Sequence, residues 1–269
     1  MKRLLPFIFL FICALSFGQD LKTKWTKVAE LEEEGNFKKA AILTEEIYLQ
    51  AKKEKNEPQL VKTFLFRAKY TLRLEEEGVK KVTENLQQEM KTASPVTKAL
   101  LQNIYATILT DYLRLNSWKI NQQKTVAKPA DKSILTWTET NFKQAIDSAY
   151  TASLFPEKEL LSTPLTAYEE IIDFSPVLSK VNRPVYDFLA EKYIEYYKWI
   201  NFQGKNPGTD ADKAFSDTEI FITLPSDKTT NNCLLLFQKL EKHYLDTRNT
   251  LGLQMATLRR IKFMFERYS

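Results

Sequence analysis

The amino-acid sequence predicts an all-α protein made of antiparallel helical hairpins, and three observations carry this prediction. Glycine and proline are scarce, with six Gly and ten Pro among 269 residues, whereas β-hairpin turns use both at regular intervals. Apolar residues recur every three or four positions from Leu21 onward, which is typical of amphipathic helices with one buried stripe. The alternation of apolar and polar residues that marks a half-buried strand is hard to find.

The first two helices are expected over 20–34 and from 37 to about 55, because the apolar spacing is interrupted at Gly35-Asn36. This pair of residues is suited to a helix C-terminus followed by a tight turn. The positions expected to be buried are Trp25, Val28, Leu31, Ala40, Leu43, Ile47 and Ala51.

Helix starts are expected near residues 20, 37, 58, 79 and 95. This spacing gives a hairpin roughly every 35 to 40 residues, the range of tetratricopeptide-like solenoids. The turn at 35–37 followed by the small Ala40 fits that repeat, since the two helices of such a hairpin approach closely. We therefore expect the hairpins to be stacked as a tetratricopeptide-like solenoid. A plain helical bundle would show the same periodicity and stays open as an alternative.

Prolines mark the beginnings of two of these helices. Pro58 lies in an opening turn, where its missing amide hydrogen costs little, and that helix is expected to continue to Gly78. Ser94-Pro95 combines an N-cap with proline at the first helical position. The expected stripes of the two helices are Leu60, Phe64, Ala68 and Leu72, and Leu101, Ile104, Ile108, Tyr112 and Leu115.

The chain is expected to fall into six segments along its length. They are a signal peptide over 1–18, helical hairpin repeats over 19–120, a polar loop over 121–136, a middle helical segment over 137–202, a loop-rich connection over 203–229 and a C-terminal helical hairpin over 230–269. Within the middle segment, Pro156, Pro164 and Pro176 predict short helical pieces, and Arg183-Pro184 begins a longer helix.

The last helix carries apolar residues on more than one side. Its expected stripe in the final hairpin is Leu251, Met255, Leu258 and Ile261, facing a helix that bears Cys233, Phe237, Leu240 and Tyr244. Near its end come Phe263, Met264, Phe265 and Tyr268. The end of a solenoid normally has a polar capping face, so we expect something to pack on this helix.

The N-terminus has the pattern of a cleaved secretion signal. Basic residues at 2–3 precede an apolar run over 4–15, and the small residues in 16–18 predict cleavage before Gln19. The run is shorter than the roughly 20 apolar residues of a membrane span, which disfavours a retained anchor. A lipid anchor on Cys13 is a further alternative, although bulky residues precede it where a lipobox has small ones. The mature chain is therefore expected to be exported across the inner membrane, periplasmic or associated with the cell envelope.

The net charge limits the kinds of partner that the mature chain can have, and the cysteine content limits its covalent cross-links. Loss of Lys2 and Arg3 with the signal lowers the formal net charge from +5 to +3, which gives no electrostatic case for nucleic acid. Cys233 is then the only cysteine, so an internal disulfide is excluded and packing alone must hold the mature chain.

No constellation of catalytic, cofactor-binding or metal-binding residues is predicted, so we expect no enzyme, no cofactor and no metal. Cys233 and His243 lie ten residues apart on one expected helix, about 15 Å along its axis. One His and one Cys are also too few for a usual zinc site. The acidic runs at 32–34 and 75–77 end helices beside lysines and are expected to be solvated. Gly204-Lys205 lacks the other residues of a phosphate-binding loop.

Aromatic residues crowd one end of the helix that follows Pro184. Core packing is the favoured interpretation, because aromatics at helical spacing normally fill the grooves between helices. A peptide-binding strip is the alternative, and this is where a surface patch would first be sought. The residues concerned are Tyr193, Tyr196, Tyr197, Trp199 and Phe202.

Several segments taken in order resemble the helical N-terminal region of large secreted bacterial alpha-2-macroglobulin-like proteins. They are the signal, the helix with Trp25, residues 34–70 (EGNFKKAAILTEEIYLQAKKEKNEPQLVKTFLFRAKY), 116–120 (NSWKI) and 182–197 (NRPVYDFLAEKYIEYY). The resemblance covers nearly the whole mature chain, and its motifs are structural rather than catalytic.

The resemblance implies a non-catalytic scaffold. In that family the helical region precedes β-sandwich macroglobulin domains, a protease bait segment and often a thioester. No Cys-x-Glu-Gln thioester motif occurs here, because Leu234-Leu235-Leu236 follow Cys233, so the family's inhibitory residues have no counterpart. The chain would be a fragment or truncated form lacking those parts, or a stand-alone helical module. Its expected partners are a protein or the downstream domains of a larger chain.

Two other functions stay open from the sequence. One is a stand-alone periplasmic tetratricopeptide-like adaptor that binds a peptide or protein in its groove. The other is a helical nutrient-binding lipoprotein of the outer membrane, which the missing lipobox and the modest length disfavour.

Overall fold

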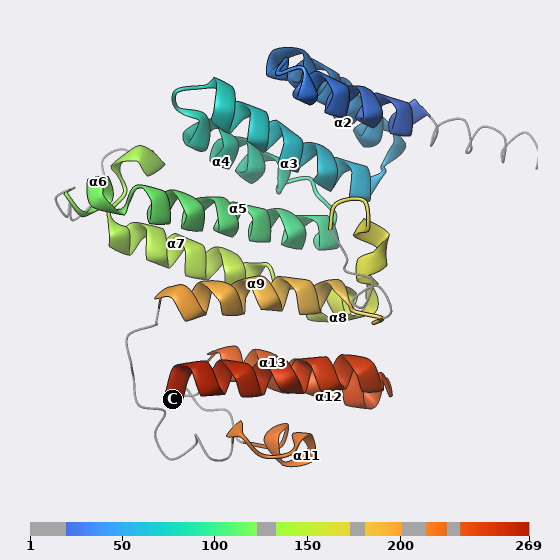
Figure 1. Cartoon of the computed structure of the whole chain (residues 1–269), viewed down its shortest axis with the longest axis vertical. Helices are drawn as coiled ribbons and strands as arrows, with labels where there is room; N and C mark the ends of the chain where they lie inside the picture. The colour runs from blue at the N-terminus through green and yellow to red at the C-terminus, as the bar shows by residue number, and fades with distance from the viewer. Residues whose placement is uncertain (1–19, 123–132, 173–180, 201–213, 225–231, 269) are drawn as a thin grey trace, which may run out of the picture. The chain divides into compact units, whose positions relative to one another are not determined.

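The computed structural model confirms the all-α fold class. It describes residues 20–122, 133–172, 181–200, 214–224 and 232–268. These residues are predominantly helical and contain no strand, apart from an isolated β-bridge between Pro164 and Pro184 (Figure 1). None of the described helices is both long and apolar enough to cross a membrane. The expected signal peptide and the expected loop around 203–212 lie outside the described residues.

The chain divides into two compact units. Unit 1 consists of Met1–Thr92 and Ala130–Thr136, and unit 2 of Ala93–Pro129 and Trp137–Ser269. The division at Thr92 falls within the stretch 19–120 that was expected to hold the hairpin repeats.

Unit 1 is built from four helices that follow one another along the chain. They are a first helix described over 20–33, α2 (Phe37–Glu54), α3 (Glu57–Leu74) and α4 (Gly78–Glu89), with the 3-10 turn η1 (Ile134–Thr136). Helix α3 packs against both α2 and α4. One core cluster joins the first helix to α2 and α3 through Leu21, Trp25, Val28, Leu31, Ala40, Ile47 and Tyr70. The predicted stripes of the first two helices are thus largely confirmed.

Local signals in the sequence set the helix ends of unit 1. Gly35 has a φ of +71°, a left-handed conformation that glycine adopts without strain, and it ends the first helix as expected. Asn56 caps α3, since its side chain accepts a hydrogen bond from the Gln59 amide at 3.3 Å. Helix α3 ends at Leu74, four residues before Gly78, and Leu72 is exposed rather than part of the core stripe.

Unit 2 contains a larger set of helices arranged around α9. They are α5 (Pro95–Leu115), α6 (Ser117–Asn121), α7 (Glu139–Ala152), α8 (Glu157–Ser162), η2 (Leu165–Tyr168), α9 (Val185–Ile200), α11 (Thr218–Phe221), α12 (Asn232–Asp246) and α13 (Thr250–Tyr268). Helix α9 contacts α5, α7, α8 and α12, and α12 pairs with α13 as a hairpin (Figure 1). The short pieces at α8 and η2 confirm the expectation drawn from the prolines, and α9 begins directly after Pro184.

Helix α5 shows where a single-stripe prediction is wrong. The Ser94 cap and Pro95 start are confirmed, with the Ser94 hydroxyl accepting from the Thr97 amide at 3.3 Å. Of the predicted stripe, however, Leu101 is buried whereas Leu115 is strongly exposed. Burial extends around more of the helix than one stripe and includes small and polar positions, such as Ala99, Asn103, Ala106 and Thr110. A spacing of three or four residues between apolar positions therefore does not by itself identify the buried face of α5.

Candidate interaction surface

The thiol and imidazole considered for catalysis, Cys233 and His243, both lie on α12 in the part of the chain that the structure describes. No group of three or more His, Cys, Asp or Glu in that part could hold a metal ion. Cys233 is buried on α12, as a small hydrophobic residue would be. His243 lies ten residues further along the same helix and is half-buried, and burial lowers its pKa. The two therefore stand too far apart to act as a catalytic pair.

The acidic runs at helix ends form ion pairs. Glu32 accepts a hydrogen bond from the Tyr70 hydroxyl at 2.7 Å and lies 2.6 Å from Lys69 Nζ. Burial acts to raise the Glu32 pKa, but the hydrogen bonds from Lys69 and Tyr70 outweigh it and the pKa is lowered. In the second run, Glu75 pairs with Lys81. These contacts join helices, and the lowered pKa of Glu32 disfavours the protonated form that a general acid needs.

Two of the aromatic residues near the end of α9 lie in the core of unit 2. Tyr193 and Tyr196 are buried, and both rings pack on Tyr150, with centroids 5.4 and 5.3 Å away. Burial and the hydrogen bond to Asp147 raise the pKa of Tyr193 to about 12. This agrees with the favoured core interpretation, whereas Phe202 lies outside the described residues. Tyr197 and Trp199 are half-buried, so the alternative of a peptide-binding strip has little exposed aromatic surface here.

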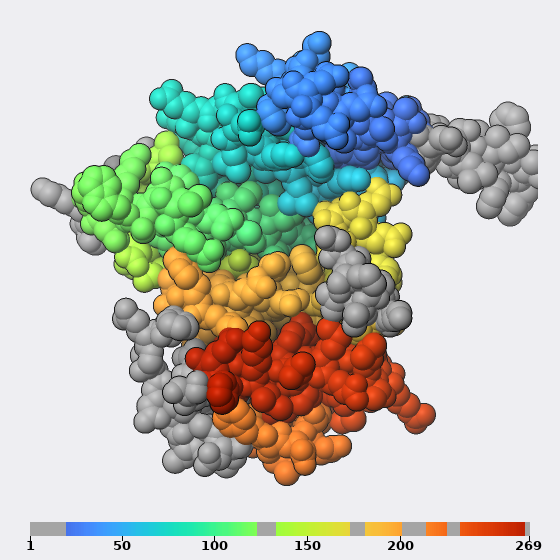
Figure 2. All heavy atoms as spheres, viewed as in Figure 1, coloured from blue at the N-terminus to red at the C-terminus, as the bar shows by residue number. Residues whose placement is uncertain are grey.

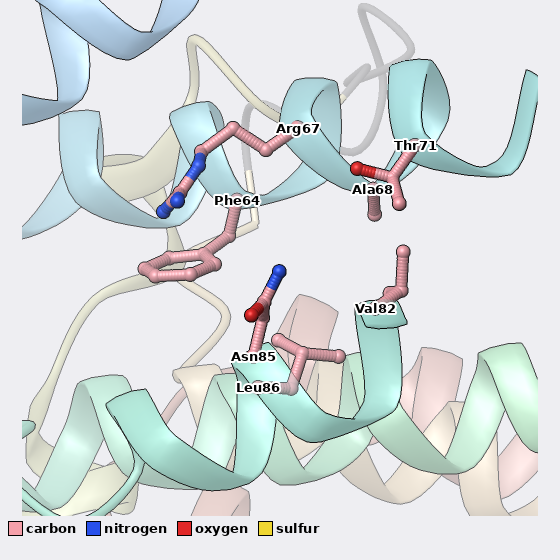
Figure 3. A pocket seen from close by; sticks show the side chains of 7 residues that line it. All are labelled: Phe64, Arg67, Ala68, Thr71, Val82, Asn85 and Leu86. Carbon is pink, nitrogen blue, oxygen red and sulfur yellow. The ribbon is translucent and has the colours of Figure 1, made fainter. Parts of the chain in front are cut away.

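A small pocket lies between α3 and α4 of unit 1 (Figure 3). Its cavity of about 20 Å³ has room for roughly one water molecule. At one end Arg67 lies over the rings of Phe64 and Tyr48 and pairs with Glu45 at 2.8 Å, so its charge is already neutralised. The remaining lining residues are Ala68, Thr71, Val82, Asn85 and Leu86. The pocket is too small for a substrate or cofactor.

The surface that stands out lies on α13, and the α12–α13 turn determines how that helix begins. Asn249 caps α13, accepting from the Gly252 amide at 2.9 Å. A Cβ atom at Gly252 would lie 2.5 Å from the Tyr244 ring, so glycine allows α12 and α13 to approach closely at this end. Further along, Phe263 packs on Phe237 with ring centroids 5.7 Å apart.

Arg260 anchors the inner side of α13 in the interior. Its guanidinium is fully buried and makes a bidentate pair with Glu241 of α12, at 2.7 and 3.3 Å. It also donates to the carbonyl oxygens of Ala214 and Ser216 and lies over the Phe221 ring. Every one of these partners is on α12 or in the segment 214–221, so a single side chain ties three parts of unit 2 together.

A second ionic cluster joins α13 to α9. The buried Asp187 carboxylate pairs with Arg183 at 3.2 Å and with Arg259 at 2.7 Å, and it accepts a hydrogen bond from Tyr244. Glu191 lies 2.6 Å from Arg183 and 3.6 Å from Arg259, so two positive and two negative charges balance. Burial acts to raise the Asp187 pKa, but Arg259 and Arg183 outweigh it and lower the pKa.

The outer side of α13 is apolar and exposed. Leu258 and Phe265 are 66% and 65% exposed, and Leu251 and Ile261 are 41% and 39% exposed. We call these four residues the α13 face. Helix α13 forms part of the surface visible in Figure 2, where it is red. Large exposed apolar residues that share one helix side mark interaction sites more often than single exposed ones do.

The α13 face corrects one prediction and supports another. The sequence placed Leu251, Met255, Leu258 and Ile261 in the core of the final hairpin, but Met255 is only half-buried and the other three are exposed. The buried positions described on this helix are Gly252, Ala256, Arg260, Phe263 and Met264. The physical reason is that the buried face includes a charged residue, Arg260, that a hydrophobic pattern does not count. The expectation of apolar residues on more than one side of this helix is confirmed, since Phe263 is buried and Phe265 exposed.

Comparison with known proteins finds no relative of this chain. No protein-family model matches the chain, and neither a curated protein nor a solved structure matches it.

Proposed function

We propose that this chain is a non-catalytic, exported helical scaffold that binds protein through the α13 face. It is similar, in this proposal, to the N-terminal helical region of bacterial alpha-2-macroglobulin-like protease inhibitors, and its hairpins are stacked as a tetratricopeptide-like solenoid. Its partner is then a neighbouring domain of such an inhibitor, and it works in the periplasm or at the cell envelope. It uses no cofactor or metal and does not bind nucleic acid.

The observation that carries the proposal is the α13 face. Four large apolar side chains are exposed on a helix whose inner side is held by two ionic clusters centred on Arg260 and Asp187. A helix fixed in this way presents its outer side without first having to become ordered, which favours binding. The polar clusters found in the described residues serve to hold helices together, so binding is the activity that the geometry supports best.

A binding experiment tests this proposal. The probe is one purified macroglobulin-type β-sandwich domain from a bacterial alpha-2-macroglobulin-like protein, titrated calorimetrically into the chain comprising residues 19–269. We expect binding that Leu258→Lys weakens about tenfold or more, because a charge at the centre of an apolar contact must be desolvated. The matched control is Ile42→Lys, which places the same charge at an equally exposed position on α2 of unit 1. Absence of binding, or equal losses in both variants, would contradict the proposal.

One observation favours a second candidate, a stand-alone periplasmic tetratricopeptide-like adaptor. Ile42 and Leu49 are both strongly exposed on α2 and lie seven residues apart, so they share one side of that helix. An extended peptide could bind there. The same pair of variants distinguishes the two functions, because an adaptor of this kind loses peptide binding with Ile42→Lys and keeps it with Leu258→Lys.

The export part of the proposal has its own test. Expressed in a Gram-negative host, the chain is expected in the periplasmic fraction with Gln19 as its first residue, which intact-mass spectrometry detects. Leu10→Arg interrupts the apolar run of the signal and should leave an unprocessed chain inside the cell. Export of the Leu10→Arg variant, or an unprocessed wild-type chain, would contradict this part.

A further inference from the structure

The segment 214–224 contacts the α12–α13 hairpin, and its first residues are held by their backbone. Helix α11 within this segment packs against α12 (Figure 1). Arg260 of α13 donates hydrogen bonds to the carbonyl oxygens of Ala214 and Ser216, the second at 3.1 Å. Main-chain contacts of this kind supply affinity in peptide recognition, because they do not depend on which side chains the bound chain carries.

Gln238 of α12 holds the other end of the segment in the same way. Its side-chain amide donates to the carbonyl oxygens of Phe221 and Leu224, at 2.9 and 3.1 Å. Both ends of the segment are therefore held through main-chain carbonyls by side chains of the hairpin, which is how a bound peptide is held.

Three side chains of the segment add a preference for sequence. Ala214 and Phe221 are fully buried, and the Phe221 ring centroid lies 4.0 Å from the Arg260 guanidinium. Between them, the Thr218 hydroxyl donates to the Glu241 carboxylate at 2.8 Å. The hairpin thus accepts a small residue, a threonine four residues later and a phenylalanine seven residues later. We call the three hairpin side chains that make these contacts the hairpin site: Gln238, Glu241 and Arg260.

The hairpin is also held together by contacts that do not involve the segment. Phe237 of α12 packs on Phe263 of α13, and Asn249 caps α13. If the segment leaves, Arg260 keeps its pair with Glu241 and loses two carbonyl acceptors. Losing acceptors from a buried charged donor is costly, so an emptied hairpin site favours a peptide that supplies the same carbonyls.

We propose that the hairpin site is a peptide-binding site that residues 214–224 occupy within the same chain, and that a partner peptide with the same pattern replaces them. The inference goes beyond the proposed function and does not rest on it, because the α13 face is the exposed side of α13 and Arg260 lies on the buried side. The tethered segment competes as though it were present at about millimolar concentration, so a free peptide displaces it efficiently only when the segment is weakened.

Fluorescence anisotropy with a labelled peptide of residues 214–224, AFSDTEIFITL, measures this exchange. The receptor is the chain comprising residues 19–269 with Phe221→Ala, which weakens the tethered segment about a hundredfold or more because a fully buried ring is lost. We expect this variant to bind the peptide at least ten times more tightly than the wild-type chain does. Circular dichroism establishes that the variant is folded.

Matched changes locate the binding. In the peptide, Phe221→Ala should abolish binding and Ile220→Ala should not, since Ile220 is exposed beside the buried Phe221. In the receptor, Gln238→Ala should weaken binding about tenfold through the loss of two hydrogen bonds, whereas Lys242→Ala, an exposed change on the same helix, should not. Leu258→Lys should also leave peptide binding unchanged, which separates the hairpin site from the α13 face.

Amide hydrogen exchange of the wild-type chain tests displacement without a destabilising variant. The unlabelled peptide is replaced by a carbon-13 version at millimolar concentration, so that its fragments differ in mass from those of the chain. We expect it to speed exchange in the segment 214–224 while α12 and α13 stay protected.

The outcomes separate this inference from the proposed function. A folded Phe221→Ala variant that binds the peptide no better than the wild type overturns the peptide site. So does exchange in the segment that never runs ahead of exchange in α12 and α13, because the segment is then an integral part of the hairpin. Binding of the β-sandwich domain would still support the proposed function in either case, and its absence would leave the peptide site standing.

Discussion

At the scale of single residues, Arg260 and Glu241 show how a buried charge is accommodated. Both side chains are fully buried, and the guanidinium uses its remaining donors on two backbone carbonyls. Removing two charges from water costs several kcal/mol per ion, and good geometry with full hydrogen bonding offsets that cost. The pair therefore fixes the position of α13 more than it adds net stability.

Breaking this pair on one side should be strongly destabilising. Glu241→Gln keeps the shape of the side chain but leaves the Arg260 charge buried without a counter-charge. We expect the free energy of unfolding, measured with urea, to fall by about 3–5 kcal/mol. Glu195→Gln breaks the exposed pair of Glu195 with Lys192 and should change it by less than about 1 kcal/mol. Similar small losses in both variants would show that Arg260 finds another partner or water.

The Asp187 cluster gives a prediction about pH. Its two arginines hold the Asp187 pKa below the value that this carboxyl has in the unfolded chain. At a pH between the two values the unfolded chain binds more protons, so stability rises with pH there. The contribution of Asp187 is thus complete above the unfolded pKa of about 3.9 and is lost as the pH falls toward the folded value.

Asp187→Asn isolates this contribution. The variant should be less stable than the wild type at pH 7, because two arginines lose their buried counter-charge. Between pH 5 and pH 3 the wild type should lose more stability than the variant, since only the wild type has this carboxyl to protonate. Urea unfolding at a series of pH values measures both slopes. Parallel slopes would mean that the Asp187 pKa is the same in the folded and unfolded chain.

At the scale of elements, helix ends were predictable and helix faces less so. Gly35, Pro58 and the Ser94-Pro95 pair act through their own backbone chemistry, so their effect is visible in the sequence. The buried face of α13 could not be predicted from the sequence, because an arginine occupies a buried position there and leucines lie on the exposed side. The hydrogen-bond partners of the buried Arg260 are 19, 44 and 46 residues away, and no local pattern encodes them.

The close approach of Gly78 to α3 leads to a prediction about the stability of the α3–α4 hairpin. A Cβ atom at this position would lie 2.5 Å from the Thr71 carbonyl oxygen and 2.9 Å from the Leu72 Cα, both backbone atoms of α3. Backbone cannot move aside as a side-chain end can, so Gly78→Ala should push the helices apart and lower the free energy of unfolding by about 1–3 kcal/mol. Glu84→Ala, an exposed change on the same helix, is the control and should stay within about 0.5 kcal/mol. Equal stability of Gly78→Ala would show that α4 can begin elsewhere.

At the scale of the whole molecule, the sequence predicted the fold class but not the boundary between its compact units. Amphipathic spacing reports that each helix has a buried side, and it carries no information on which distant helix covers that side. The candidate surface was predicted only in outline, as apolar residues on more than one side of the last helix. The residues of this surface can be identified only once the positions of Arg260 and Asp187 are known, because their ion pairs determine which side of α13 faces inward.

The two units lead to a prediction about unfolding. Each has its own helices and its own buried residues, and chains with more than one such unit commonly depart from a single two-state transition. Gly78→Ala acts in unit 1 and Glu241→Gln in unit 2, so each should speed amide hydrogen exchange mainly in its own unit. Mass spectrometry of peptides from α2–α4 and from α12–α13 would measure this in the same sample. If either variant accelerates exchange equally in both sets of peptides, the chain unfolds as one cooperative body, and the destabilisation of one helical hairpin reaches the α13 face.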